Sequence, residues 1–399
     1  SNGLEKRPKL RFPGFDEPLE HKELLHYLVE NTDRNKQLKF GKENVLSVSG
    51  EYGIVNQIAF QGRSFAGESV ADYHVVETDD IVYTKSPLKA KPYGIIKVNN
   101  GVPGIVSTLY AVYHPLKTVV PRFVDFYFSN DLRLNKFLKP LVNIGAKHDM
   151  KVNNTFVLTG MVVFPPLREQ QKIVDFLTIL DRRIDVQRKK VEALKKYKRG
   201  LLNQIFSAIS KGSQRRKLRE LVHVSGGKTP SMSNSLYWNG DIVWISSKDM
   251  KSSRISGSEL KITNLALNEM TLYHPGTLLL VARSGILKHS LPLAILEVDA
   301  TINQDIKALQ VHGCNAFYLY YAILSQEDNI IRTLVKTGTT VQSLMMDSFL
   351  NIEIPTPDID LQQSIIDKLA KLEKYVDVQE KELSLLSQMR NGLLQQLFI

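Results

Sequence analysis

Two long segments of the chain place apolar residues at alternating intervals of four and three residues. The first runs from Gln171 to Phe206 and the second from Gln363 to Phe398. A mean spacing of 3.5 residues is typical of a coiled-coil seam, which is narrower than the apolar face of an ordinary surface helix. At 1.5 Å per residue each segment predicts a helix about 54 Å long, too long for one small domain to cover. We therefore expect the two helices to pack on each other.

The second segment repeats the first without a gap, 192 residues later in the chain. Fifteen of the 36 paired positions are identical, including 185–187 with 377–379 and 200–202 with 392–394. This repeat is far longer than the repeat of a solenoid protein. It predicts two similar halves, each made of a globular domain followed by one long helix.

Both helices interrupt their apolar seams at the same places. The predicted seam of the first helix consists of Ile173, Leu177, Leu180, Ile184, Gln187, Val191, Leu194 and Leu201. The predicted seam of the second consists of Ile365, Leu369, Leu372, Val376, Gln379, Leu383, Leu386 and Leu393. Polar residues fall in line with the seam at Gln187 and Gln379 and again at Lys198 and Arg390. Such residues cost stability but fix register.

The shared interruptions favour an antiparallel pair of helices within one chain, related by a pseudo-two-fold axis. In that arrangement Gln187 and Gln379 are both expected near the middle of the pair. Two alternatives remain for each helix. It pairs with a second copy of the protein, or it packs on the domain that precedes it.

The stretches before the helices predict two α+β domains of similar design, each with a mixed sheet. Short β-rich runs are separated by Gly, Pro, Asn and Asp, and each domain also contains helical patterns. Residues 22–26 resemble 219–223 at the start of each domain, and each domain ends in an apolar strand closed by proline. The predicted boundaries are an N-terminal arm and first domain over 1–165, a helix over 166–212, a second domain over 213–357 and a helix over 358–399.

The composition predicts a globular protein with a polyanionic partner. Lys and Arg number 52 against 41 Asp and Glu, which gives a formal net charge of +11 and favours nucleic acid over charge that serves only solubility. No apolar run approaches the roughly 20 residues needed to span a bilayer, and the first residues lack the apolar core of a signal peptide. The single cysteine, Cys314, excludes an internal disulfide and a Cys-cluster metal site and fits the reducing cytoplasm.

Several phrases of the sequence resemble one known family. They are GGKTPS at 226–231, WNGDIVWISSKDM at 238–250, GTT at 338–340, the helix start PPLREQQ at 165–171 and the twice-given helix end GLLxQ[IL]F. Their order and duplication are similar to the specificity subunit of type I restriction–modification systems, from about residue 10 to the end of the chain. The first domain lacks the Trp-Gly-Asp phrase. The second helix starts with DLQQ at 360–363, where the family usually has Glu-Gln.

The resemblance implies a sequence-specific DNA-binding subunit with two target recognition domains. Each domain is expected to contact a short half-site of double-stranded DNA in the major groove, where every base pair shows a distinct pattern of donors and acceptors. The helix pair is expected to hold the domains apart, so that the target is bipartite with an unspecified gap.

The same resemblance implies the partners. Two modification subunits would bring S-adenosylmethionine and methylate adenine, and two restriction subunits would use ATP and Mg²⁺. We expect no catalysis by this chain, no cofactor or metal bound by it, and no membrane partner. The alternative function is a coiled-coil adaptor whose two domains bind protein rather than DNA.

Catalytic signatures are absent from the sequence. The nearest match to the catalytic loop of amino-methyltransferases is FPPL at 164–167, which has an apolar residue where a hydrogen-bonding side chain is needed. GKT at 227–229 imitates the end of a phosphate-binding loop, but Val222 occupies the place of its first glycine. The nine histidines include no His-x-x-x-His pair. These observations favour a binding protein over an enzyme.

Long donor side chains on polar turns are the candidate DNA contacts, because they reach base edges and phosphates. In the first domain the candidates are Arg63, Lys85, Lys89, Lys91, Lys147 and His148. In the second they are Lys228, Tyr237, Lys248, Arg254, Arg283, Lys288 and Gln342. Arg283 and Lys85 are the best placed, since each follows an apolar strand into a turn. The alternative for each candidate is an exposed side chain that serves solubility.

Overall fold

The chain forms two compact units, each with one α+β domain and part of each long helix. A computed structural model describes residues 8–85, 91–144, 150–151, 153–336, 338 and 341–398. The first unit comprises Ser1–Arg188 with Glu382–Ile399, and the second comprises Lys189–Lys381. Because the units divide within the helices and not at their ends, the predicted domain boundaries stay a prediction.

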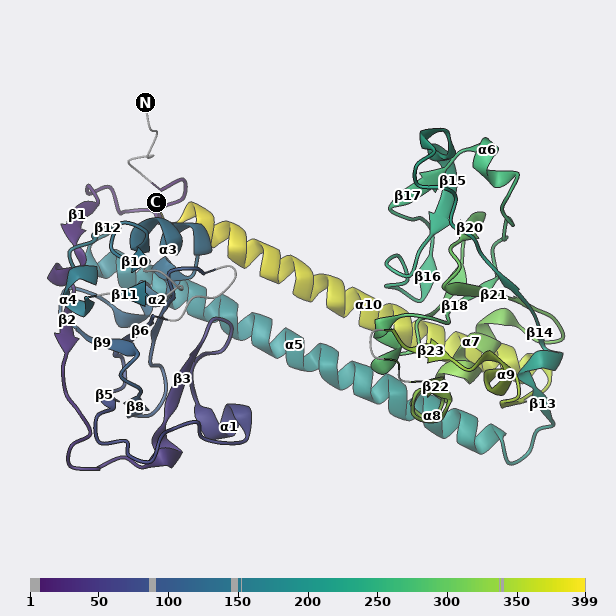
Figure 1. Ribbon diagram of the computed structural model, residues 1–399, viewed down its shortest axis with the longest axis horizontal. Helices are drawn as coiled ribbons and strands as arrows, with labels where there is room; N and C mark the ends of the chain where they lie inside the picture. Colours follow the sequence, from purple (N-terminus) through teal and green to yellow (C-terminus); the bar gives the residue numbers. More distant parts are fainter. Residues whose placement is uncertain are drawn as a thin grey trace. The chain divides into compact units, whose positions relative to one another are not determined.

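Two long continuous helices follow the two domains (Figure 1). Helix α5 spans Leu167–Ile209 and helix α10 spans Ile359–Gln396. Among the described residues, no helix combines the length and the apolar character that crossing a membrane requires.

The two helices run antiparallel in both units. In the first unit, Leu180 near the start of α5 packs against Leu386 near the end of α10. In the second unit, Leu202 near the end of α5 shares a core with Ile365 near the start of α10. The predicted antiparallel pairing within one chain is therefore confirmed.

The predicted seam positions are buried or half-buried along both helices. The buried ones are Ile173, Leu177, Leu180, Ile184, Gln187, Val191, Ile365, Leu369, Val376, Gln379 and Leu386. The half-buried ones are Leu194, Leu201, Leu372, Leu383 and Leu393. Near the helix ends the more buried residues are Leu202 and Leu394, one position after the predicted Leu201 and Leu393. There each helix packs on a globular domain as well as on the other helix, so its buried face turns toward the domain.

The first unit contains a four-stranded antiparallel sheet in the order β2-β9-β6-β7. Its strands are β2 (Leu28–Asn31), β6 (Ile81–Thr84), β7 (Ile95–Val98) and β9 (Tyr110–Pro115). Helix α2 (Pro121–Phe128) packs on β6 and β7, and α3 (Asp131–Leu138) follows it. Proline at the first position favours the start of α2, and the Asn130 side chain caps α3 by accepting from the Arg133 amide.

Smaller elements surround this sheet. Strand β1 (Glu20–Glu23) pairs with β12 (Met161–Phe164), β5 (His74–Val76) pairs with β8 (Gly104–Val106), and β10 (Asn143–Ile144) pairs with β11 (Met150–Lys151). A hairpin of β3 (Leu46–Ser49) and β4 (Gly53–Asn56) leads into the short helix α1 (Gln57–Gln61), and α4 (Asn154–Val157) precedes β12.

The second unit contains a five-stranded sheet in the order β14-β21-β18-β19-β16. Its strands are β14 (Val222–Gly226), β16 (Arg254–Ile255), β18 (Leu278–Val281), β19 (Leu293–Leu296) and β21 (Ile306–Val311). A three-stranded sheet joins β15 (Trp238–Ile245), β17 (Leu260–Ile262) and β20 (Ala300–Ile302). The remaining elements are α6 (Asn264–Leu267), α7 (Ala316–Leu324), α8 (Glu327–Leu334), α9 (Met346–Phe349), and the strand pairs β13 (Arg215–Lys217) with β24 (Glu353–Pro355) and β22 (Val335–Lys336) with β23 (Ser343–Leu344).

The two units share one plan. In the first, Phe398, two residues after α10 ends, packs on Phe123 of α2, with ring centroids 5.4 Å apart. In the second, Phe206 at the end of α5 packs on Tyr318 of α7, with ring centroids 5.5 Å apart. The end of α10 therefore packs on the core of the first domain, and the end of α5 packs on the core of the second, at an equivalent place.

The predicted match between residues 22–26 and 219–223 is displaced by three residues. The short 3-10 turn Leu24–His26 follows β1, and the equivalent turn Leu218–Glu220 follows β13. Leu24 is therefore equivalent to Leu218. Both Leu218 and Leu221 are fully buried, so the sequence alone offers two leucines that fit the position of Leu24.

A glutamine that recurs in both repeats ties the start of each long helix to the domain before it. In the first unit the Gln170 side chain accepts a hydrogen bond from the Val120 amide at 3.0 Å, just before α2, and donates to the Pro165 carbonyl at 2.9 Å. In the second unit Gln362 makes the same two contacts, with the Asn315 amide and the Pro357 carbonyl. This explains why glutamine recurs at both helix starts.

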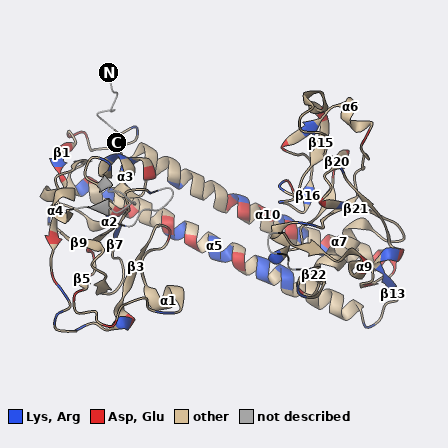
Figure 2. Ribbon diagram, viewed as in Figure 1, with Lys and Arg blue, Asp and Glu red and all other residues tan. Residues whose placement is uncertain are grey.

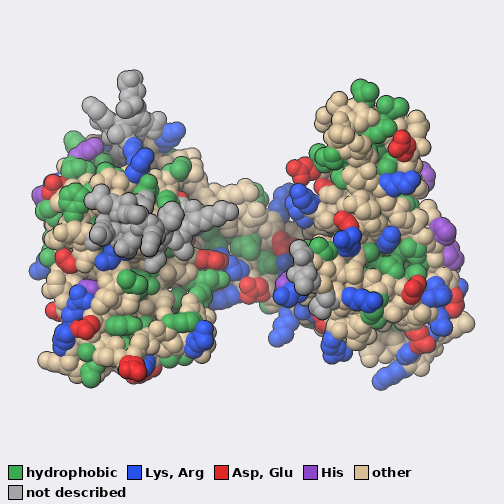
Figure 3. Space-filling model, in the orientation of Figure 1, with side chains coloured by type: hydrophobic (Ala, Val, Ile, Leu, Met, Phe, Trp, Pro, Cys, Tyr) green, Lys and Arg blue, Asp and Glu red, His purple; other side chains and the backbone are tan. Residues whose placement is uncertain are grey.

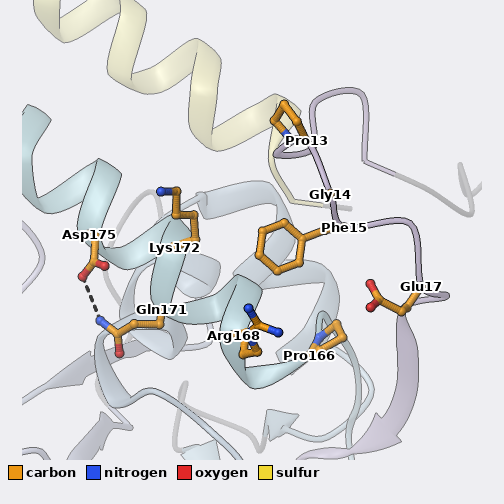
Figure 4. A pocket seen from close by; sticks show the side chains of 9 residues that line it. All are labelled: Pro13, Gly14, Phe15, Glu17, Pro166, Arg168, Gln171, Lys172 and Asp175. Atoms are coloured by element: carbon orange, nitrogen blue, oxygen red, sulfur yellow. Dashed lines mark hydrogen bonds between the residues drawn. The ribbon is translucent and has the colours of Figure 1, made fainter.

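The N-terminal arm lies along the first turns of α5. The Arg11 guanidinium donates to both carboxylate oxygens of Glu169, which is only 2% exposed, at 2.9 and 2.7 Å. Leu10 donates its amide to the Gln396 carbonyl at the end of α10. Figure 4 shows Phe15 of the arm beside Arg168 and the other side chains that line a pocket here. The arm thus joins the start of one long helix to the end of the other.

Candidate nucleic-acid interface

Three turns of the second unit meet at one edge of its five-stranded sheet. Strand β14 ends at Gly226 opposite Lys307, and β18 ends at Val281 opposite Ile306. Three turns therefore lie together: 227–231, 282–288 and 303–305. We call these turns, together with Gln342, the second sheet edge. It carries four of the residues predicted from the sequence as DNA contacts: Lys228, Arg283, Lys288 and Gln342.

The first turn of the second sheet edge is held by two tryptophans. Trp244 donates its indole N–H to the Lys228 carbonyl at 3.1 Å, and Trp238 donates to the Ser231 carbonyl at 3.1 Å. The two rings pack edge-to-face with centroids 5.1 Å apart. A side chain on Gly227 would come within 2.0 Å of the Ile302 carbonyl, so only glycine fits there. The motifs at 226–231 and 238–250 therefore form one framework that presents the exposed Lys228 side chain.

The other turns bring further donors to the same edge. Arg283 and Lys288 are exposed, and the Ser284 amide donates to the Gln342 carbonyl at 3.0 Å. Thr229 donates its hydroxyl to the Gln304 side-chain oxygen at 2.5 Å, which leaves the Gln304 amide group free to donate. Gln304 was not among the predicted residues, because it acquires its place only when β20 and β21 fold next to the glycine turn.

The other three candidates of the second unit lie elsewhere. Arg254, on the edge strand β16, pairs with Glu297 at 3.1 Å and stacks on Phe317 at 4.8 Å. Tyr237 donates to Glu269 at 3.1 Å, and Lys248 is exposed on the turn after β15. The structure therefore brings four of the seven predicted residues of the second unit together.

The equivalent edge of the first unit carries Lys85 and Lys91. Strand β6 ends at Thr84, opposite Tyr110 and Ile95. Lys85 follows directly and Lys91 lies shortly before β7. Lys89, Lys147 and His148 lie outside the described residues.

Lys85 is tied to its own domain. Its ammonium group donates to the Asn154 side chain at 3.1 Å, and Asn154 donates to Glu30 at 2.8 Å. Burial lowers the pKa of Lys85, Glu30 partly opposes this change, and the positive charge of Arg34 adds to it. Lys91 in turn pairs with Asp131 at 3.1 Å, and its side chain is 17% exposed. Both lysines give positive potential to this edge, but neither is as open as Arg283.

Exposed aromatic residues add a second kind of contact to the first unit. Tyr52, at the tip of the β3–β4 hairpin, packs on Phe60 of α1 with ring centroids 5.3 Å apart, and the two are 61% and 47% exposed. Arg63, a predicted contact, stacks on the exposed Phe65 at 4.5 Å. Figure 3 shows hydrophobic and basic side chains intermingled over this part of the first unit.

The aromatic pair lies near the edge that carries Lys91. A side chain on Gly50, in the same hairpin turn as Tyr52, would lie 3.5 Å from the Lys91 ammonium group and 3.5 Å from Ile95 at the start of β7. Aromatic faces among cations are typical of nucleic-acid-binding surfaces. This pair was not among the residues predicted from the sequence, although Tyr, Phe and Arg recur over 52–65.

Basic residues also line α5 (Figure 2). Several of them pair with α10: Arg183 with Glu382 at 3.4 Å in the first unit, and Lys195 with Glu380 in the second. This part of the positive charge therefore stabilises the helix pair in addition to any contact with an outside polyanion.

A family model described as the type I restriction modification DNA specificity domain matches residues 68–196 and 210–388. The chain therefore belongs to the family of type I restriction–modification DNA specificity domains. Its two matches fall on the two repeats that the sequence predicts.

Individual relatives are similar over part of their length. The specificity subunit of the type I restriction enzyme EcoR124I/EcoR124II of Escherichia coli is 38% identical over 160 residues, which are 39% of this chain and 40% of that protein. The MjaIX specificity subunit of Methanocaldococcus jannaschii is 30% identical over 190 residues, which are 46% of this chain and 43% of that protein. The chain thus spans less than half the length of each of these relatives in alignment.

Solved structures share the fold over nearly the whole chain. The type I restriction–modification S subunit from M. genitalium gives a TM-score of 0.60 at 13% identity, covering 98% of this chain and 99% of that one. A chain from a study of assembly and conformational transition of the type I R-M system gives 0.56 at 16% identity, covering 98% and 99%. At these identities the likeness concerns the fold alone.

Proposed function

We propose that this chain is the specificity subunit of a type I restriction–modification complex and that it binds a bipartite DNA target without catalysing a reaction itself. The observation that carries the proposal is the duplication of one sheet edge. The edge bears Lys228 and Arg283 in the second unit and Lys85 and Lys91 in the first. Two equivalent cationic edges on one chain fit two half-sites of one duplex.

The second sheet edge is the better defined of the two. It combines an exposed arginine, an exposed lysine and the Gln304 side chain on turns fixed by hydrogen bonds. Arginine and glutamine are the side chains that pair best with guanine and adenine edges in the major groove. Fixed turns reduce the entropy lost on binding.

We propose that the helix pair determines the length of the gap between the half-sites. Helices α5 and α10 contain 43 and 38 residues, so each is about 57–65 Å long at 1.5 Å per residue. One turn of B-DNA is about 34–36 Å. Helices that each continue from one unit into the other suit a spacer between two DNA-binding domains.

We assign two modification subunits to equivalent surfaces on the two units. Val186 in the first unit and Val378 in the second are repeat equivalents, 66% and 53% exposed. Met389 in the first unit and Tyr197 in the second are a further equivalent pair, 48% and 59% exposed. Exposed apolar side chains kept in both repeats fit two copies of one partner. Adenine methylation with S-adenosylmethionine, and the steps that need ATP and Mg²⁺, would belong to the modification and restriction subunits.

Single-molecule mapping of methylated adenines tests the proposal. The host carries this chain together with its modification subunit, and the control host carries the modification subunit alone. We expect methylation at one bipartite motif that disappears in the control. Methylation that is unchanged without this chain, or that follows a single uninterrupted motif, would contradict the proposal.

A further inference from the structure

Tyr321, Glu373 and Lys198 form a buried polar cluster where the second domain meets both long helices. Glu373 of α10 is 7% exposed. It accepts a hydrogen bond from the Tyr321 hydroxyl of α7 at 3.1 Å and pairs with the Lys198 ammonium group of α5. The cluster therefore joins three elements: the domain helix α7 and the two helices of the spacer.

Apolar packing alone sets the orientation of this joint less sharply than polar contacts do, because the hydrophobic effect has no direction. A buried carboxylate behaves differently, since it is costly unless its partners keep their geometry. Two further contacts tie α7 to the spacer helices: Gln362 of α10 accepts from the Asn315 amide just before α7 at 3.0 Å, and the Tyr318 ring packs on Phe206 of α5. Tyr318 and Tyr321 lie about one helical turn apart on the same face of α7. Two anchors one turn apart fix the direction of α7 relative to the spacer helices.

The first unit has a cluster at the equivalent place. Asp181 of α5 pairs with Arg390 of α10 and lies 3.9 Å from Arg122 of α2. Asp181 and Arg390 are the repeat equivalents of Glu373 and Lys198, each 192 residues away. The domain side of the cluster is a guanidinium in one unit and a phenol in the other. The place of the joint is therefore kept in both units while its chemistry differs.

We propose that Tyr321 and Glu373 are positioning residues that fix the second DNA-binding domain on the spacer and thereby determine the length of the DNA gap that the protein accepts. The inference rests on the proposed function. A domain free to turn on the spacer would move its sheet edge along the duplex and accept gaps one base pair longer or shorter.

The test uses the full chain assembled with its modification subunits and the DNA motif found by methylation mapping. Binding is measured on three duplexes that have the native gap, one base pair fewer and one base pair more. Tyr321→Phe removes only the hydroxyl and leaves the Glu373–Lys198 pair in place, and Glu373→Gln keeps the shape of the side chain. We expect the preference for the native gap to fall about tenfold in both variants, on the scale of one hydrogen bond to a charged group.

The matched control is Glu380→Gln, which breaks the exposed pair of Lys195 and Glu380 on the same helices. This variant is expected to keep the preference for the native gap. Its thermal unfolding shows how much the loss of an ion pair alone lowers the stability of the protein. A Tyr321→Phe variant that retains the full gap preference would overturn the inference, whatever its thermal stability. A wild-type complex without any bipartite preference would instead overturn the proposed function.

Discussion

The indole N–H of Trp244 donates to the backbone carbonyl of Lys228 across 3.1 Å, so a tryptophan in a strand holds the turn that presents a lysine. This contact joins two motifs of the sequence through residues that lie 16 positions apart. It gives Trp244, which is 5% exposed in its own cluster, a role in positioning the proposed DNA contact Lys228.

Trp244→Phe is expected to loosen the turn 227–231 and relax base preference at the half-site bound by the second domain. The ring packing is largely kept, while one part-buried hydrogen bond to the Lys228 carbonyl is lost, at a cost of about 1 kcal/mol. Methylation mapping in the host measures the preference. Leu236→Ala, which truncates a 67% exposed side chain of the same unit, is the control. Equal relaxation in both variants would argue against a specific role for the Trp244 contact.

Arg283→Ala is expected to change the base preference at one position of the second half-site, at a cost of about 1–3 kcal/mol in discrimination. The side chain is exposed at the end of β18, where it is free to reach a base edge. Competition binding with single base-pair changes measures the effect. Lys217→Ala, exposed on β13, should leave every preference intact. If Arg283→Ala weakens all sequences alike and lowers the salt dependence, the residue contacts phosphate and not a base.

Glu373→Lys is expected to lower the free energy of unfolding by about 2–4 kcal/mol, because it places two positive charges in a largely buried site. The double variant Lys198→Glu with Glu373→Lys should recover part of that loss, since it restores an ion pair. Urea unfolding of the full chain measures both. The exposed pair of Arg183 and Glu382 is the comparison, where reversal should cost less than about 1 kcal/mol. Failure of the double variant to recover any stability would indicate that Tyr321 and not Lys198 is the main partner of Glu373.

Much of this architecture could be predicted from the sequence because it rests on periodicity. The 3.5-residue spacing and the duplicated interruptions at Lys198 and Arg390 predicted an antiparallel helix pair, and each interruption has an acidic partner on the other helix. The position of Arg283 on a turn after an apolar strand was also predicted, since a strand that runs into a turn is a local pattern.

The rest depends on contacts between residues far apart in the chain. The local sequence predicts Lys85 as an exposed lysine on a turn. Its hydrogen-bond partner Asn154, however, lies 69 residues later and holds the side chain against the domain. Gln304 joins the second sheet edge through the pairing of distant strands, and there it contacts Thr229, 75 residues before it. Periodicity carries no information on such pairs, so neither the loss of Lys85 as an open contact nor the gain of Gln304 was predictable.

Tyr52→Ala and Phe60→Ala are expected to weaken DNA binding without changing its salt dependence. Stacking of an aromatic ring on a base contributes about 1–3 kcal/mol and releases no counterions. Lys91→Ala should instead reduce the slope of log affinity against log salt concentration. Fluorescence anisotropy over a salt series separates the two effects. Val102→Ala, at a 73% exposed apolar position of the same domain, is the control. An unchanged affinity in both aromatic variants would remove the pair from the interface.

His74 gives the first domain a pH dependence of stability. Its side chain is 2% exposed in β5, and its Nδ1 atom has no hydrogen-bond partner among the described residues. Burial, with a further contribution from the charges of Arg34 and Lys85, lowers the pKa of His74 to about 4 from its ordinary value of 6.5. Between these two values the unfolded chain binds a proton that the folded chain does not. The free energy of unfolding therefore falls as the pH drops through this window.

The expected loss from this one group between pH 7 and pH 4.5 is about 2–3 kcal/mol. His74→Gln keeps a neutral polar side chain at every pH, so its free energy of unfolding should depend less on pH by that amount. Urea unfolding at the two pH values, followed by a probe in the first domain, measures the difference. His223→Gln, at an exposed position on β14, is the control and should behave as the wild type. A His74→Gln variant whose stability falls with pH as steeply as the wild type would show that His74 is protonated in the folded domain, and that its burial does not exclude the charge.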